Sequence, residues 1–266
     1  MSAPMLRKAV IPAAGLGKRM LPLTNGAPKE MLPVAGRPMI HHVVQEAVDA
    51  GIEQICIVIR AGKESISSYV EESQPRCEIT FVYQPEPKGL GDALLCARQF
   101  VGDECFAMLI PDQLVRSEVG PVTQLTSKRL PGNSVISSLI RIPDSAVAYF
   151  PGARSFIYEP DGAQSNVVVI SGIEPAEPAP KRAAPAVRGF GRTIYPPEVF
   201  RFLGMEFADP RTGEVDLLKT FRSLLKEVPS YGVFLEGEAF DLGTIEGYQY
   251  FEPKWRTSGP SGSRAS

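Results

Sequence analysis

Short apolar runs alternate with amphipathic segments along the first 110 residues of the chain. Short continuous apolar runs suit strands that are covered on both faces, as in a parallel sheet. We expect such strands at residues 9–11, 54–59, 78–83 and 105–110. Apolar residues at helical spacing between these runs predict helices over residues 39–50, 63–72 and 89–100. Strands that alternate with helices in this way are typical of a doubly wound, mainly parallel α/β sheet.

The pattern after residue 116 is weaker, but it still predicts short elements. Further strands are expected at residues 134–142, 146–149, 155–158, 166–170, 191–195 and 233–236. Helices are expected at residues 198–204, 213–225 and 247–251. The Pro- and Ala-rich segment 172–185 predicts an extended, partly mobile connection. The Gly- and Ser-rich residues 258–266 predict a disordered tail.

A glycine-containing loop, Ala13-Ala14-Gly15-Leu16-Gly17, follows the first predicted strand. Two glycines let the backbone turn sharply and let a ligand approach without a Cβ atom in the way. Successive backbone N–H groups in such a turn form a concave anion site. Lys18, Arg19 and Lys29 then place three cations within twelve residues. A strand, a glycine loop and nearby cations together favour a polyanionic phosphate ligand.

Two common phosphate-binding motifs are excluded at this loop. A dinucleotide fingerprint requires a third glycine where Met20 stands, and a Walker A loop requires Ser or Thr where Arg19 stands. The structural alternative is an ordinary strand-to-helix turn with exposed cations.

A longer pattern surrounds the loop. Residues 15–24 read Gly-x-Gly-x-Arg-Met-x-Pro-x-Thr, and residues 28–33 read Pro-Lys-Glu-Met-Leu-Pro. Together they resemble the sugar-1-phosphate nucleotidyltransferases, and the second run looks like the bacterial UTP–glucose-1-phosphate uridylyltransferase branch. The resemblance implies a Rossmann-like fold with a small α+β sugar-side lobe. It also implies a single domain over residues 1–257, with a nucleotide half at 1–115 and an acceptor half at 116–257.

A second loop, residues 84–93, follows the third predicted strand and contains Lys-Gly-Leu-Gly. The amide of Gln84 can both donate and accept, which suits the edge of a uracil or thymine base. The alternative is a loop amide beside a helix N-terminus. By the resemblance, Gln84 reads the base and Gly89 lets the backbone approach it. The nucleotide-binding residues that the resemblance implies are Ala13, Ala14, Gly15, Gly17, Glu30, Gln84 and Gly89.

Two aspartates are candidates for a metal site. Asp112 follows the strand expected at 105–110, and Asp241 precedes Gly243 in an Asp-x-Gly turn. Carboxylates beyond the ends of strands suit Mg²⁺, a hard cation that prefers oxygen ligands. The resemblance implies that both bind the metal and that Asp112 also meets the acceptor. The alternatives are a capping or turn role for Asp112 and a turn role for Asp241.

The acceptor side departs from the family pattern. Glu177 retains the glutamate of the family's Glu-Lys-Pro-Lys segment, but the lysine that meets the sugar phosphate falls on Pro178. Lys181 or Arg182 could substitute for it from nearby. Phe150 stands where the family has a glycine after tyrosine, and its bulk could block a hexose or reshape the sugar site.

Composition narrows the classes of function. A formal net charge of −2 gives no overall field for nucleic acid, and no apolar run reaches the roughly 18 residues of a membrane helix. The first strand leaves no room for a signal peptide. The four cysteines form no Cys-x-x-Cys pair, so we expect reduced thiols in a cytosolic protein. His41 and His42 are adjacent in a helical pattern, so we expect that they do not both face one site and that zinc is disfavoured.

These residues suit nucleotidyl transfer, with Arg19 and Lys29 as the catalytic cations. One interpretation is transfer of UMP from UTP to glucose 1-phosphate. A second is a relative that uses another nucleotide or another phosphorylated or phosphonylated acceptor. A third is a catalytically silent nucleotide-binding relative, against which the presence of Arg19, Lys29, Asp112 and Asp241 argues. The resemblance also implies a homodimer or homotetramer.

Overall fold

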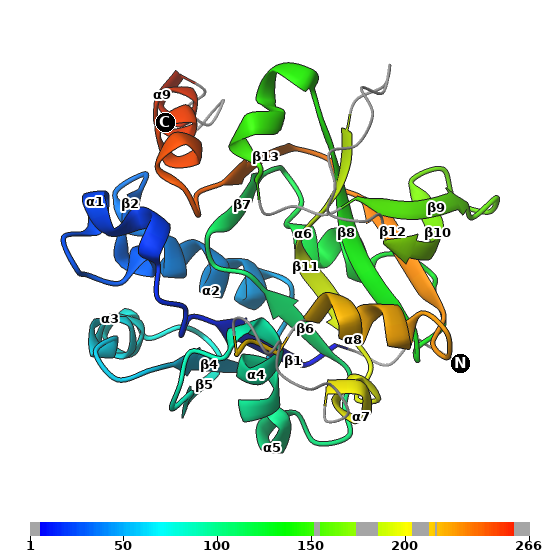
Figure 1. The fold of residues 1–266 in the computed structure, drawn as a ribbon, viewed down its shortest axis with the longest axis horizontal. Coiled ribbons are helices and arrows are strands. Elements are labelled where there is room, and N and C mark those ends of the chain that lie inside the picture. The colour runs from blue at the N-terminus through cyan, green and yellow to red at the C-terminus, as the bar shows by residue number, and fades with distance from the viewer. Residues whose placement is uncertain (1–5, 152–154, 174–185, 204–212, 216, 258–266) are drawn as a thin grey trace, which may run out of the picture.

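The centre of the molecule is a nine-stranded mixed sheet (Figure 1). The structure is a computed structural model that describes residues 6–151, 155–173, 186–203, 213–215 and 217–257. The order across the sheet is β5 (Glu78–Tyr83), β4 (Gln54–Ile59), β1 (Lys8–Pro12), β6 (Phe106–Leu109), β11 (Ala186–Tyr195), β8 (Val135–Ile142), β12 (Ser230–Phe234), β10 (Val167–Ile173) and β9 (Phe156–Pro160). Two small antiparallel pairs accompany it, β7 (Gln113–Arg116) with β13 (Glu238–Asp241) and β2 (Pro33–Val34) with β3 (Arg37–Pro38).

The four strands expected in the first 110 residues form a continuous parallel part of this sheet, and β12 also pairs in parallel with β8. β1 pairs in parallel with β4 and β6, and β4 pairs in parallel with β5. Their carboxyl ends therefore meet at one edge. β11 joins β6 and β8 by antiparallel pairing, so the second half of the chain extends the same sheet. The predicted α/β class is confirmed, and the sheet as a whole is mixed.

Helices cover both faces of the sheet, as a doubly wound fold requires. The helices are α1 (Leu21–Thr24), α2 (Met39–Asp49), α3 (Glu64–Ser73), α4 (Gly89–Cys96), α5 (Arg98–Val101), α6 (Pro121–Thr126), α7 (Val199–Leu203), α8 (Leu217–Leu224) and α9 (Ile245–Thr257). Alternate residues of β1 enter different cores: Ala9 and Ile11 pack with α2 and α3, whereas Val10 packs with α4 and α7. This division explains why residues 9–11 of the strand are all apolar.

Several expected elements differ from the structure. Residues 146–149 form part of the 3-10 helix η3 (Asp144–Tyr149), not a strand, because Pro143 starts a turn in which the Ala146 N–H donates to the Pro143 carbonyl. The helix expected at 89–100 is divided at Ala97 into α4 and α5. The pair β7–β13 was not expected. Residues 174–185 and 258–266, including most of the expected connection and the whole tail, lie outside the described residues.

Within the described ranges, none of the helices combines the length and the apolarity needed to cross a bilayer.

A buried ion pair ties the middle of the sheet to α2. Arg192 of β11 is 1% exposed, and its guanidinium donates to both carboxylate oxygens of Glu46, at 2.9 and 2.7 Å. The same guanidinium donates to the carbonyl oxygens of Ile110 and Gly191, at 3.1 and 3.0 Å. Arg192 therefore fixes the backbone at the point where β6 leaves the sheet.

Removing one partner of this pair should be costly. We expect Arg192→Met to lower the free energy of unfolding by about 3–5 kcal/mol, because it leaves the Glu46 carboxylate buried beside no cation. Adding Glu46→Leu should recover much of that loss, because the isolated charge is then gone. Equilibrium urea denaturation measures both effects.

The matched control is Arg201→Met, because Arg201 pairs with Glu227 while both side chains remain more than half exposed. That substitution should change stability by at most about 1 kcal/mol. A cost for Arg192→Met no larger than the cost for Arg201→Met would contradict the role of the buried pair.

Candidate active site

A cavity of about 450 Å³ opens where the parallel strands end. Its wall includes Gly15 and Arg19 after β1, Gln84 after β5 and Asp112 after β6. Asp241, at the end of β13, completes the wall from the C-terminal part of the chain. Of the candidate residues predicted from the sequence, the structure brings the following to this cavity: Ala14, Gly15, Arg19, Lys29, Gln84, Gly89, Asp112 and Asp241.

Asp112 and Asp241 face the same small space. In the β7–β13 pair, Asp241 lies opposite Gln113, and the Leu242 N–H donates to the Asp112 carbonyl at 2.7 Å. A Cβ atom at Gly243 would lie 2.7 Å from Asp112 Oδ2 and 3.1 Å from Asp241 Oδ1. Only glycine leaves room for both carboxylates at this position.

The two carboxyl groups have opposite pKa shifts. Burial, reinforced by the nearby Asp112, raises the pKa of Asp241 to about 6. Burial also disfavours the ionised form of Asp112, but the adjacent Lys29 outweighs it and holds the pKa of Asp112 below its usual value. The cavity therefore contains one firmly ionised carboxylate and a second one that lacks a full counter-charge.

Lys29 is the cation that neutralises Asp112. It lies in the 3-10 helix η2 (Lys29–Met31), and its ammonium group forms a short ion pair with Asp112 Oδ2. Burial opposes its charge, but Asp112 and Glu30 raise the pKa of Lys29. Gly17, with φ of 63°, lets the glycine loop pass beside the Lys29 side chain, which would lie 3.7 Å from a Cβ atom at that position.

A second buried lysine lies behind the glycine loop. Lys63 is 3% exposed, and its ammonium group donates to the Ala13 carbonyl at 2.6 Å and to Glu30 Oε2 at 2.8 Å. Glu30 is 1% exposed. Ala13 and Glu30 are thus joined behind the cavity wall, and the Glu30 carboxylate faces Lys63. The sequence places Lys63 only at the start of a helix, so this link was not predicted.

Gln84 is held by the start of α4. Its side chain is 3% exposed, and its Nε2 donates to Asp92 Oδ2 at 2.7 Å and to the Gly89 carbonyl at 3.1 Å. Gly89 has φ of +89°, a conformation that favours glycine. Glu214, which the sequence did not single out, also lines the cavity, because residues 213–215 pack against this loop.

Arg19 and Lys18 lie on the 3-10 helix η1 (Lys18–Met20), on the exposed side of the cavity. Their positions suit contact with a ligand that enters from solvent. Lys18, one of the three cations that the sequence places near the glycine loop, also lines the cavity.

The acceptor-side candidates are placed less completely. Glu177 and Lys181, with Pro178, lie outside the described residues. Phe150 packs in an apolar cluster with Ile140 and Ile142, and its ring centroid lies 6.0 Å from that of Phe190. Its bulk is therefore accommodated in the interior of the protein.

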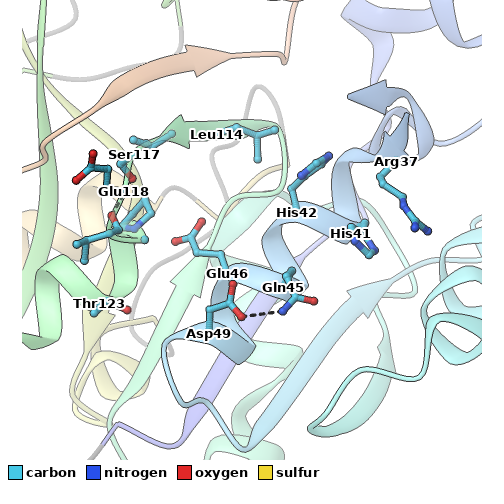
Figure 2. A pocket seen from close by; sticks show the side chains of 14 residues that line it. Arg37, His41, His42, Gln45, Glu46, Asp49, Leu114, Ser117, Glu118 and Thr123 are labelled. Atoms are coloured by element: carbon cyan, nitrogen blue, oxygen red, sulfur yellow. Dashed lines mark hydrogen bonds between the residues drawn. The ribbon is translucent and has the colours of Figure 1, made fainter. Parts of the chain in front are cut away.

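A second cavity, of about 540 Å³, lies between α2 and residues 114–123 (Figure 2). His41 and His42 both line this cavity, although their rings hydrogen-bond to different partners. Both residues lie near the N-terminal end of α2. Their rings lie edge to face, with centroids 5.8 Å apart. His42 Nε2 lies 2.8 Å from the Val34 carbonyl, and His41 Nδ1 lies 3.2 Å from the Tyr69 hydroxyl.

Known proteins of similar sequence show the family to which the chain belongs. A family model described as nucleotidyl transferase matches residues 8–146. The UTP–glucose-1-phosphate uridylyltransferase of Bacillus subtilis (strain 168) is 32% identical over 266 residues, covering 91% of this chain and 88% of that protein. A protein of the same name from Staphylococcus haemolyticus (strain JCSC1435) is 33% identical over 269 residues, covering 91% of this chain and 90% of that protein.

Solved structures share the fold over almost the whole chain. The UTP-bound UGPase from Acinetobacter baumannii gives a TM-score of 0.81 at 29% identity, covering 97% of this chain and 95% of that chain. A UDP-glucose pyrophosphorylase complexed with UDP-glucose gives a TM-score of 0.81 at 27% identity, covering 95% and 99%. The chain therefore belongs to the nucleotidyl transferase family and is an enzyme of that class. Within the family it is similar to the UTP–glucose-1-phosphate uridylyltransferases, as the motifs predicted.

The carboxylate pair makes the stability of the metal-free protein depend on pH through Asp241. Its folded-state pKa of about 6 lies above the usual 3.8, so between about pH 4 and 6 the folded state binds a proton that the unfolded state lacks. The stability that Asp241 contributes is present below this window and is lost as pH rises through it.

We therefore expect Asp241→Asn, which is isosteric and uncharged, to raise the free energy of unfolding at about pH 8 by about 2 kcal/mol without divalent cations. At about pH 4.5 most of this gain should disappear, because Asp241 is then largely protonated. Urea denaturation at both pH values measures the difference, with the exposed Asp103→Asn as control. A gain of equal size at both pH values would refute the expectation.

Proposed function

We propose that this enzyme transfers UMP from UTP to glucose 1-phosphate, releasing pyrophosphate and forming UDP-glucose. Similarity to UTP–glucose-1-phosphate uridylyltransferases over 91% of the chain supports these substrates. The observation that carries the proposal is the meeting of Arg19, Lys29, Asp112 and Asp241 on one cavity. In open α/β sheets, ligands bind at this carboxyl edge of the strands.

The proposed reaction needs positioning and charge more than it needs a base. An oxygen of the sugar phosphate attacks the α-phosphorus of UTP, and the bond from that phosphorus to the pyrophosphate leaving group breaks. The attacking oxygen is already anionic near neutral pH, so the chain must hold two anions in line and neutralise the charge that develops. Arg19 suits the triphosphate because its fork can bind two oxygens at once. Lys29 neutralises the α-phosphate or the attacking phosphate.

The Asp112–Asp241 pair fits a divalent cation, for which we propose Mg²⁺. The oxygens of both side chains face the space beside Gly243, and burial, followed by the nearby Asp112, raises the pKa of Asp241, so a bound cation would favour its ionised form. Among the described residues, no three or more His, Cys, Asp or Glu side chains gather as a metal site. This suits Mg²⁺, which usually combines one or two carboxylates with substrate phosphates and water. When bound, the ion would supply charge neutralisation at the phosphates.

The nucleotide half of the cavity offers backbone groups and one amide for the base and the phosphates. Glu30 supports this half indirectly, because it holds Lys63 against the Ala13 carbonyl. The groups that we propose to meet the nucleotide are those of Ala14, Gly15, Gly17, Gln84 and Gly89. Ala13 is fully buried, and its N–H and carbonyl bond to Val58 and Lys63, so with Glu30 it supports the loop from behind.

On the acceptor side we propose Asp112, Glu177 and Lys181 as contacts of the sugar phosphate. Lys181 supplies the cation that Pro178 lacks. We further propose a homodimer or homotetramer, which light scattering would measure. A cytosolic location fits the four cysteines, all of which are free thiols.

A pyrophosphate-release assay tests the proposed function. Each common nucleoside triphosphate is paired with a panel of sugar phosphates and other phosphorylated or phosphonylated acceptors. Release with UTP and glucose 1-phosphate, together with UDP-glucose as product, supports the proposal. Release only with another pair would overturn the substrate assignment, and nucleotide binding without release from any pair would overturn the enzymatic role.

Arg19→Ala should reduce turnover by about two orders of magnitude or more, because a donor that stabilises developing charge contributes roughly 3 kcal/mol. Steady-state kinetics with saturating substrates measure the loss. Arg76→Ala, which removes an exposed arginine remote from the cavity wall, is the matched control and should leave turnover unchanged. Unchanged turnover in Arg19→Ala would show that the arginine has no catalytic role.

A further inference from the structure

The amide of Gln84 has only one orientation that its neighbours allow. Its nitrogen lies 2.7 Å from Asp92 Oδ2 and 3.1 Å from the Gly89 carbonyl oxygen. A carboxylate and a carbonyl can only accept hydrogen bonds, so both select the nitrogen and not the oxygen of the amide. The reverse orientation would place Gln84 Oε1 against two acceptors. The chemistry of the partners, and not an arbitrary choice of amide rotamer, therefore fixes the group.

Both hydrogens of the Gln84 nitrogen are used by these two partners, because an amide nitrogen has two. Gln84 also lines the cavity. The atom of the amide that remains available to a ligand is therefore Oε1, which can accept a hydrogen bond but cannot donate one. The bond to Asp92 is the stronger of the two, because an ionised acceptor shortens and strengthens a hydrogen bond.

We propose that Asp92 is a positioning residue that sets the base preference of the enzyme, by turning the oxygen of Gln84 towards the base. This inference rests on the proposed function and deepens it. Uracil presents an N3–H donor that the Gln84 oxygen can accept, whereas cytosine presents a lone pair at N3. The enzyme therefore selects UTP over CTP, because cytosine would place two acceptors face to face.

The position of Asp92 in the fold favours this role. It lies in the first turn of α4, an eight-residue helix, where the helix dipole stabilises negative charge. Gly89, the second acceptor, begins the same helix. Residues 213–215 close over this turn, and the Gly91 N–H donates to the Val215 carbonyl at 3.3 Å. The loop at residues 84–93 is thus held by the Gln84–Asp92 hydrogen bond and by residues 213–215, which limits how far the Gln84 side chain can rotate.

The test is Asp92→Asn, assayed as kcat/KM for UTP and for CTP with glucose 1-phosphate. Asparagine has the same shape but can donate as well as accept, so only the Gly89 carbonyl still selects the nitrogen of Gln84 and the reverse orientation of the amide becomes more accessible. We expect the ratio of kcat/KM for CTP to that for UTP to rise by about tenfold, the value of one hydrogen bond. Asp103→Asn, an exposed substitution of the same type, should leave the ratio unchanged.

Calorimetric titration of UTP and CTP without acceptor gives the same comparison independently of turnover. If wild-type protein releases no pyrophosphate from UTP and glucose 1-phosphate, the proposed function fails, and the ratio of dissociation constants still decides this inference. Equal binding of the two nucleotides by the wild type would overturn it. So would an unchanged ratio in Asp92→Asn, or an equal loss for both nucleotides, which indicates a purely structural role.

A second variant guards against misfolding. Asp92→Glu retains a carboxylate that can only accept, so it should keep the preference for UTP better than Asp92→Asn does. Circular dichroism compares the folding of both variants with that of the wild type. If Asp92→Glu loses the preference as completely as Asp92→Asn while both remain folded, the carboxylate is not the determinant and the inference is overturned.

Discussion

Two carboxylates that share one small space impose the constraint on which the rest of the structure depends. Like charges in a buried setting repel, and the raised pKa of Asp241 records that repulsion together with burial. The fold tolerates the pair because Lys29 neutralises Asp112 and because Gly243 leaves room that any side chain would fill. The negative charge of Asp241 that remains is the charge that the proposed cation would neutralise.

The loops that form this cavity are supported from behind by buried cations. Lys63 donates to the Ala13 carbonyl below the glycine loop, and Arg192 donates to the Ile110 carbonyl below the turn that carries Asp112. Each cation is neutralised by a glutamate, Glu30 or Glu46 respectively. Buried ion pairs contribute little net stability, but losing one partner is costly, so such pairs define geometry. A buried ion pair thus holds the backbone of each of two loops that line the cavity, the glycine loop and the turn that carries Asp112.

The nucleotide half of the fold could be predicted because its signals are local. Continuous apolar runs identified β4 and β5, and glycines and cations identified the loop after β1. The missed features depend on partners far away in the chain. The sequence around Lys63 does not indicate that its side chain will contact Ala13. The sequence around Glu214 does not indicate that it will lie beside the loop at residues 84–93. The prediction of a strand at 146–149 was wrong because these apolar residues also pack against the core as part of a 3-10 helix after Pro143.

The contact of residues 213–215 with the base loop, and the arrival of Asp241 beside Asp112, have a consequence for synthesis on the ribosome. The parallel core of β1, β4, β5 and β6 is complete once residue 109 has emerged, yet β11 must still insert beside β6. The cavity at the carboxyl ends of the parallel strands acquires its last wall only when Asp241 has been synthesised, long after the parallel core. A prematurely terminated polypeptide therefore carries the glycine loop without its second carboxylate, so truncated translation products lack a finished active site.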